Sequence, residues 1–97
     1  MSERFHAQLE LADYLAELGD LRSARAELLV AAADAPEDAA VSVMIGQKFE
    51  QAGDLREALR FYEKGMKLSP KDAEALNGAR RVMEKIGEVS PTEGAPQ

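Results

Sequence analysis

The sequence has no cysteine, no tryptophan, a single histidine and few aromatic residues. Without cysteine the chain forms no disulfide, holds no thiolate-bound metal and has no cysteine nucleophile. With His6 alone it has no histidine pair for a metal site and no obvious base to activate a serine. Each glycine stands alone, so no Gly-rich phosphate loop occurs. We therefore expect a protein that is not an enzyme and that uses no metal or cofactor.

Basic residues are also outnumbered, since 12 Lys and Arg stand against 18 Asp and Glu, a formal net charge of −6. This charge repels nucleic acid and anionic lipid. No apolar run approaches the roughly 18 residues of a membrane span. The N-terminal residues lack a basic segment followed by an apolar stretch. We expect no nucleic-acid or membrane partner, and a cytoplasmic location.

The apolar mass of the chain is mostly alanine and leucine, which occur seventeen and eleven times. Both favour helix over sheet. A chain of 97 residues fits one domain or one short repeat array. The sequence therefore predicts a single all-α unit.

Glycines and prolines reveal an internal repeat. Gly19, Gly53 and Gly87 recur every 34 positions, and Pro36 and Pro70 are separated by the same interval. Aligning residues 5–38 with 39–72 gives seven identical pairs, concentrated at turns and small residues. Such a period is typical of arrays in which each repeat is one supersecondary unit.

The segments between these landmarks have the apolar spacing of helices, two to each repeat. The first is expected to end at Gly19 and the second before Pro36, and Asp20 and Asp54 suit N-caps. Glu57 is placed to complete a capping box with Asp54. The other three helices are expected at about 39–52, 55–68 and 73–86.

The domain is therefore expected to span residues 1–87, with repeats 5–38 and 39–72 and a capping helix at 73–87. The remaining segment, 88–97, contains two prolines and little to bury, so it is expected to be a disordered tail. Small residues at Ala12 and Gly46, facing Ala24 and Ala58, would let the two helices of each repeat approach closely.

The landmarks resemble the tetratricopeptide repeat, a 34-residue helix-turn-helix unit. The better copy carries Ile45, Gly46, Phe49, Gly53, Asp54, Ala58, Tyr62 and Pro70 at the family's positions. The resemblance implies a short right-handed superhelical array of helix-turn-helix hairpins with about five helices. It also implies a scaffold or adaptor that binds a peptide or helix of a partner protein in a concave groove lined by the first helix of each repeat.

Transferred to this chain, that layout gives a partner-binding groove lined by Leu9, Asp13, Glu17, Val43, Met44, Gln47, Gln51, Asn77 and Arg81. Val43 and Met44 are its candidate apolar anchors, with ordinary core packing as the alternative. Asp13 and Glu17 would meet basic residues of the partner. With Glu10 they form an acidic stripe for which cation binding, paired carboxylates and a merely solvated face are the other interpretations.

The first helix carries a second apolar stripe, because Leu11 and Leu15 would face its hairpin partner while Ala7, Tyr14 and Leu18 lie elsewhere. Tyr14 and Leu18 are therefore expected to be partly exposed. One alternative function is a structural self-assembly unit, a homodimer that pairs this stripe across a two-fold axis. A truncated array or a simply exposed patch would produce the same stripe.

Overall fold

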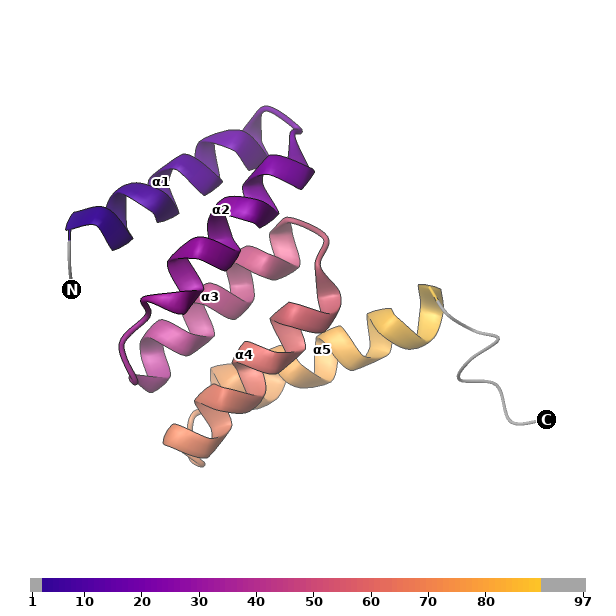
Figure 1. Cartoon of the computed structure of the whole chain (residues 1–97). Coiled ribbons are helices and arrows are strands. Elements are labelled where there is room, and N and C mark those ends of the chain that lie inside the picture. Colours follow the sequence, from indigo (N-terminus) through magenta and orange to yellow (C-terminus); the bar gives the residue numbers. More distant parts are fainter. Residues whose placement is uncertain (1–2, 90–97) are drawn as a thin grey trace.

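The computed structural model describes residues 3–89, and this part of the chain is all-α. Its five helices are α1 (Glu3–Glu17), α2 (Leu21–Ala33), α3 (Ala39–Gln51), α4 (Leu55–Leu68) and α5 (Ala73–Val89). They follow one another as two hairpins and a fifth helix (Figure 1). No helix among residues 3–89 combines the length and the apolar character that a membrane span requires.

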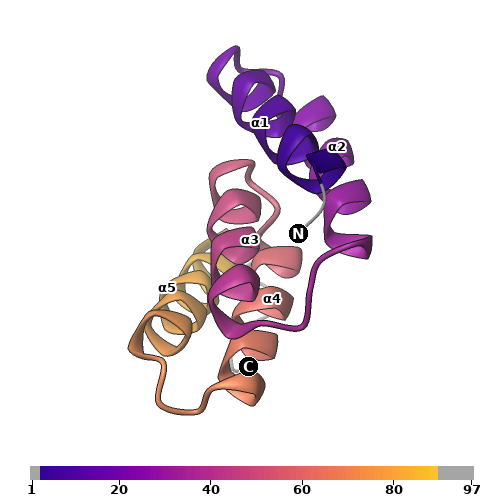
Figure 2. The ribbon, with the colours of Figure 1, turned by 90° about the vertical axis from the view of Figure 1, so that its left-hand side faces the viewer.

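The helices form two layers. Figure 2 shows α1, α3 and α5 along one side of the molecule and α2 and α4 along the other. The closest packing joins α1 to α2, α3 to α4 and α4 to α5, while α3 also touches α5 and α2 touches α3. Helices α2 and α4 are therefore each in contact with helices of the layer formed by α1, α3 and α5.

Aspartates start four of the helices, as the sequence predicts for two of them. Before α5, the Asp72 side chain accepts hydrogen bonds from the backbone N–H groups of Glu74 and Ala75, 2.9 and 3.3 Å long. The side chains of Asp20, Asp38 and Asp54 each accept a hydrogen bond, 3.1 to 3.2 Å long, from the backbone N–H three residues further on. The predicted capping box is wrong, because the Glu57 carboxylate pairs with Arg60 at 3.2 Å instead. The N–H of Asp54 already donates to the carbonyl of Phe49, so it needs no side-chain partner.

Glycine ends the first helix of each repeat. Gly19 has φ 85° and Gly53 has φ 82°, a left-handed conformation that glycine adopts at little cost. Gly87 has no positive φ, and α5 continues through it to Val89. The helix therefore extends two residues beyond the expected capping helix 73–87. Of the expected tail, residues 90–97 lie outside the described residues.

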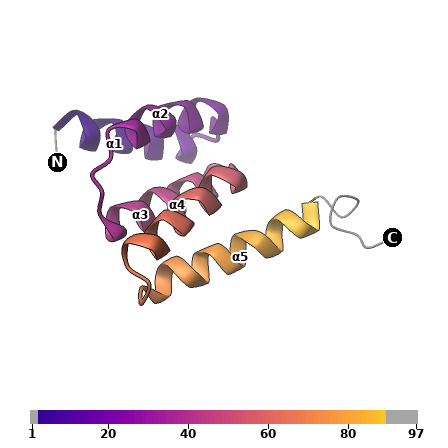
Figure 3. The ribbon, with the colours of Figure 1, turned by 60° about the horizontal axis from the view of Figure 1, so that its bottom comes forward.

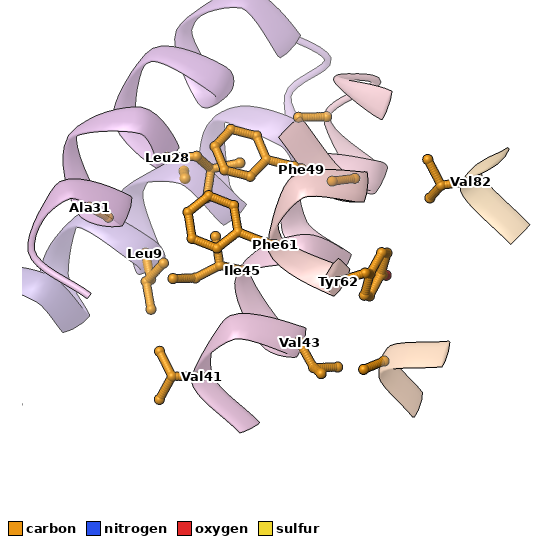
Figure 4. Packing of buried hydrophobic residues seen from close by; sticks show 14 of the residues in the cluster. Leu9, Leu28, Ala31, Val41, Val43, Ile45, Phe49, Phe61, Tyr62 and Val82 are labelled. Carbon is orange, nitrogen blue, oxygen red and sulfur yellow. The ribbon is translucent and has the colours of Figure 1, made fainter. Parts of the chain in front are cut away.

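Large apolar residues of both layers form one core. Phe49 and Phe61 stack with ring centroids 5.7 Å apart. In Figure 4, Phe61 points toward Leu28 on α2, while Tyr62 lies on the opposite side of α4, toward Val82 on α5. The core thus extends along both sides of α4, toward α2 on one side and toward α5 on the other.

The predicted core stripe of α1 is wrong. Phe5, Leu9 and Ala12 are the buried residues of this helix, whereas Leu11 is 43% exposed. The small residues, by contrast, lie where the sequence places them. Ala12, Ala24 and Ala58 are buried, and a Cβ added to Gly46 would meet the Ala58 carbonyl oxygen at 3.2 Å. Two side chains of normal size would not fit between α3 and α4 at this height.

Candidate functional site

We call the layer formed by α1, α3 and α5 the first-helix face (Figure 2). Two hollows are lined by residues of these helices. The first, of about 460 Å³, is lined by Asp13, Ala16, Glu17, Lys48 and Gln51. The second, of about 360 Å³, is lined by Gln47, Glu50, Gln51, Arg81 and Lys85. Because Gln51 lines both, the two hollows are neighbours, and together they form a polar surface across three helices. We call this surface the depression.

An ion pair joins α1 to α3 within this face. The Lys48 Nζ donates to both carboxylate oxygens of Asp13, at 2.7 and 2.8 Å. The Lys48 side chain is 19% exposed and the Asp13 side chain 44% exposed. The apolar stem of Lys48 is therefore covered while its charge is satisfied at the edge of the first hollow.

A denser cluster joins α3 to α5 around Glu50. The Glu50 Oε2 accepts from Arg81 Nε and from Lys85 Nζ, both at 2.7 Å. The Oε1 accepts from Arg81 Nη2 and from the Tyr62 hydroxyl, both at 2.8 Å. This one carboxylate therefore ties together three helices, since Tyr62 belongs to α4.

The cluster changes how its members titrate. The hydrogen bond from Arg81 lowers the pKa of Glu50 from 4.5 to about 2, although partial burial opposes the change. Burial, followed by the hydrogen bond to Glu50, raises the pKa of Tyr62 to about 12. The same hydrogen bond raises the pKa of Arg81 above its ordinary value. Glu50 therefore stays ionised, and Tyr62 protonated, across the ordinary range of pH.

We expect the Glu50→Gln variant to be about 1 kcal/mol less stable than the parent at neutral pH, a modest loss for a partly exposed cluster. A shift of one pKa unit corresponds to about 1.4 kcal/mol, but water screens pairs whose cations are half exposed, as Arg81 and Lys85 are. The unfolded chain takes up a proton near pH 4.5 and the folded chain only near pH 2. The stabilisation is therefore complete above pH 4.5 and lost as the pH falls toward 2.

Urea unfolding of parent and variant, repeated down this range of pH, measures the difference. Glu37→Gln is the control, because Glu37 pairs with Lys64 at 3.0 Å while its side chain is 71% exposed. A surface pair of this kind should change stability by less than about 0.5 kcal/mol. A difference between parent and Glu50→Gln that does not shrink in acid would contradict the assignment.

Most polar residues predicted to line the groove are accessible. Glu17, Gln47, Gln51, Asn77 and Arg81 are exposed, whereas Met44 is partly buried against the core. The exposed Arg81 is already engaged by Glu50, and Asp13 by Lys48. A partner that binds here would therefore contact Asp13 and Arg81 while each is already paired within the protein.

Two predicted groove residues are in the core, which corrects that part of the prediction. Leu9 is 5% exposed and Val43 is 4% exposed. Figure 4 shows Leu9 near Ile45, and Val43 on the side of α3 that faces α5. Helix α3 contacts α2, α4 and α5, so its buried surface is too broad to leave Val43 as an anchor.

The acidic stripe of α1 does not assemble into a cation site. Among the described residues, no three His, Cys, Asp or Glu side chains lie close enough together to hold a metal ion. Asp13 directs both of its oxygens to Lys48. Glu10 and Glu17 are exposed, which fits the solvated face among the interpretations.

The second stripe of α1 is exposed, as predicted. Tyr14 is 58% exposed and Leu18 is 63% exposed, and Ala7 is also at the surface. Pairing of this stripe with a second copy stays a prediction.

Sequence reasoning missed the interhelical charge pairs, although a signal for them exists. Asp13 and Lys48 are 35 residues apart, and so are Glu50 and Lys85. In a 34-residue repeat, this spacing places the two residues on neighbouring first helices, one position out of phase. Opposite charges at this spacing therefore indicate contacts between repeats.

No protein-family model matches the chain, and no curated protein matches it.

Proposed function

We propose that this chain is a non-enzymatic protein-interaction module that binds a peptide or helix of a partner protein across the first-helix face. The observation that carries the proposal is the pair of neighbouring hollows that share Gln51. Its lining is polar and largely exposed, so it suits a segment that makes many hydrogen bonds. The scaffold or adaptor role is part of this proposal, and the cytoplasmic location remains a prediction.

The depression has opposite charge at its two ends, which defines the kind of partner. At the α1 end, Asp13 and Glu17 outnumber Lys48, which leaves one negative charge. At the α5 end, Arg81 and Lys85 outnumber Glu50, which leaves one positive charge. We infer that the bound segment carries a basic residue at the α1 end and an acidic residue at the α5 end.

A tetratricopeptide-like superhelical array is the layout that we propose for the fold. Three observations support it. Gly19 and Gly53, 34 positions apart, both have positive φ; the helices follow one another as hairpins; and Gly46 lies in close contact with Ala58. In such an array the first helices line the binding surface. The proposed face is formed by those helices.

A homodimer through α1 is the second candidate function. The exposure of Tyr14 and Leu18 favours it, since adjoining exposed apolar residues often mark contact surfaces. The exposed carboxylates of Glu10 and Glu17 oppose it, because a two-fold axis would bring them toward their own copies.

The test selects peptides from a random display library with the whole chain as bait and then measures their affinity for charge variants. Glu17→Lys reverses an exposed charge at the α1 end, so we expect affinity for peptides with a basic residue to fall about fivefold, the effect of about 1 kcal/mol. The affinity of the parent should also fall with added salt, since exposed charges are screened over about 8 Å at physiological ionic strength.

Asp34→Lys is the matched control, because it makes the same charge change at an exposed position after α2, outside both hollows. Its affinity should equal that of the parent. Selected peptides that bind Glu17→Lys and the parent equally well would contradict the proposed orientation. Amide shifts confined to α2 and α4 on peptide addition would place the site elsewhere.

A further inference from the structure

A third hollow, of about 450 Å³, lies between α4 and α5, away from the first-helix face. Helix α5 contributes Leu76, Ala79, Arg80, Met83 and Glu84 to its lining. Leu76 is 44% exposed and Met83 is 59% exposed. The groove residues of α5, Asn77 and Arg81, lie on a different stripe of the helix.

The repeat period explains what this hollow is. Of these five, Leu76, Ala79, Arg80 and Met83 lie 34 positions after Ser42, Ile45, Gly46 and Phe49. In α3 these four positions are buried, and α4 covers them, because Gly46 meets Ala58 and Tyr62 and Phe49 stacks on Phe61. The hollow therefore lies over the surface of α5 that corresponds to the surface of α3 on which α4 packs. No helix of the described part of the chain covers it, and α5 lies at the end of the array (Figure 3).

Arg80 determines what can occupy this hollow. It stands where α3 has Gly46, so a helix cannot approach as closely as α4 approaches α3. An occupant must instead stand further out and present carboxylates to the guanidinium. Glu63 and Glu84 line the same hollow, and none of these three charges forms an ion pair with any described residue.

We propose that a second copy of this chain occupies the hollow, with the two α5 helices antiparallel about a two-fold axis that passes between Ala79 and Arg80. This arrangement places Met83 of each copy beside Leu76 of the other. Arg80 of each copy then lies within reach of Glu63 and Glu84 of the other, so that both sets of charges are paired. The interface is isologous, the commonest type in soluble homo-oligomers.

Charge complementarity favours this face over α1 as the site of self-association. The stripe around Tyr14 and Leu18 is bordered by Glu10 and Glu17 and has no basic residue among them. Self-pairing there brings like charges together. The hollow on α5 carries charges of both signs, so each Arg80, although it lies next to the Arg80 of the other copy at the axis, has carboxylates of that copy with which to pair.

The first measurement is the mass in solution by light scattering and sedimentation at about 100 µM, a concentration that populates a micromolar dimer. We expect a mass twice the 10.5 kDa of one chain. Met83→Glu should raise the dissociation constant at least tenfold. Tyr14→Lys combined with Leu18→Glu should leave it unchanged.

A charge exchange tests the pairing itself. One variant carries Arg80→Glu, and the other carries Glu63→Lys together with Glu84→Lys. Each variant alone should be monomeric, because like charges then face each other across the two-fold axis. Mixed in equal amounts they should form a heterodimer, since every pair across the interface is again of opposite sign. The altered residues are exposed, so circular dichroism should show unchanged helical content in both variants.

A parent that stays at 10.5 kDa overturns the proposal. A parent dimer that resists Met83→Glu but dissociates with the α1 double variant moves the interface to α1 and overturns it as well. A mixture that fails to associate, although the parent is dimeric, excludes the arrangement of charges. None of these results affects peptide binding to the first-helix face, which uses another side of α5.

Discussion

The Ala58→Leu variant is expected to lose about 3 kcal/mol of unfolding free energy, because it overfills a closely packed interface. Ala58 is fully buried on α4, and its carbonyl oxygen lies 3.2 Å from the position that a Cβ on Gly46 would take. Three more carbon atoms at this height would push α3 and α4 apart and separate Phe49 from Phe61. Urea unfolding followed by circular dichroism measures the loss.

Ala26→Leu is the matched control, since Ala26 is an exposed residue in the interior of α2. Leucine is almost as good a helix former as alanine, so we expect a change of less than about 0.5 kcal/mol. If the two variants lost the same stability, the cost would come from leucine in the helix rather than from the contact between α3 and α4, and our account of that contact would be wrong.

The helix bounds follow from local chemistry that is visible in the sequence. Asp20 and Asp54 cap the second helix of each repeat, and Gly19 and Gly53 end the first with positive φ. These signals act within a few residues and depend little on the rest of the fold. Gly87 failed as a signal, because glycine permits a left-handed end without imposing one.

The buried stripe of α1 could not be chosen from spacing alone. Leu9, Leu11, Leu15 and Leu18 surround much of the helix, so more than one apolar stripe can be drawn. In the structure α1 packs mainly on α2, and the side that carries Phe5 and Leu9 is the one that becomes buried. Such a choice depends on which neighbour is present, and this is a property of the whole array.

The candidate site, too, could be predicted only in part from the sequence. The resemblance to the tetratricopeptide repeat implied that the first helices carry it, and the structure has Glu17, Gln47 and Gln51 of these helices at the surface. Their surroundings depend on side chains from the next repeat, such as Lys48 beside Asp13. A pattern within one helix contains no information about these partners.

The Gly78→Ala variant should lose about 2 kcal/mol of unfolding free energy, because overpacking outweighs the better helix propensity of alanine. A Cβ at residue 78 would lie 2.7 Å from Cδ1 of Tyr62 and closer still to Cε1. The ring cannot easily move away, because it is fully buried and its hydroxyl donates to Glu50 at 2.8 Å. Overpacking of about 3 kcal/mol therefore exceeds the gain of about 1 kcal/mol from helix propensity. Thermal and urea unfolding measure the net effect.

Gly87→Ala makes the same substitution in the same helix, at a position where an added Cβ meets nothing within 4 Å. We expect it to raise the free energy of unfolding by about 0.5 kcal/mol, since only helix propensity changes near the helix end. In a Tyr62→Leu background, Gly78→Ala should no longer destabilise, because the ring that it strikes is gone. A cost that persists in that background would show that the close contact of α5 with the Tyr62 ring is not what requires glycine at residue 78.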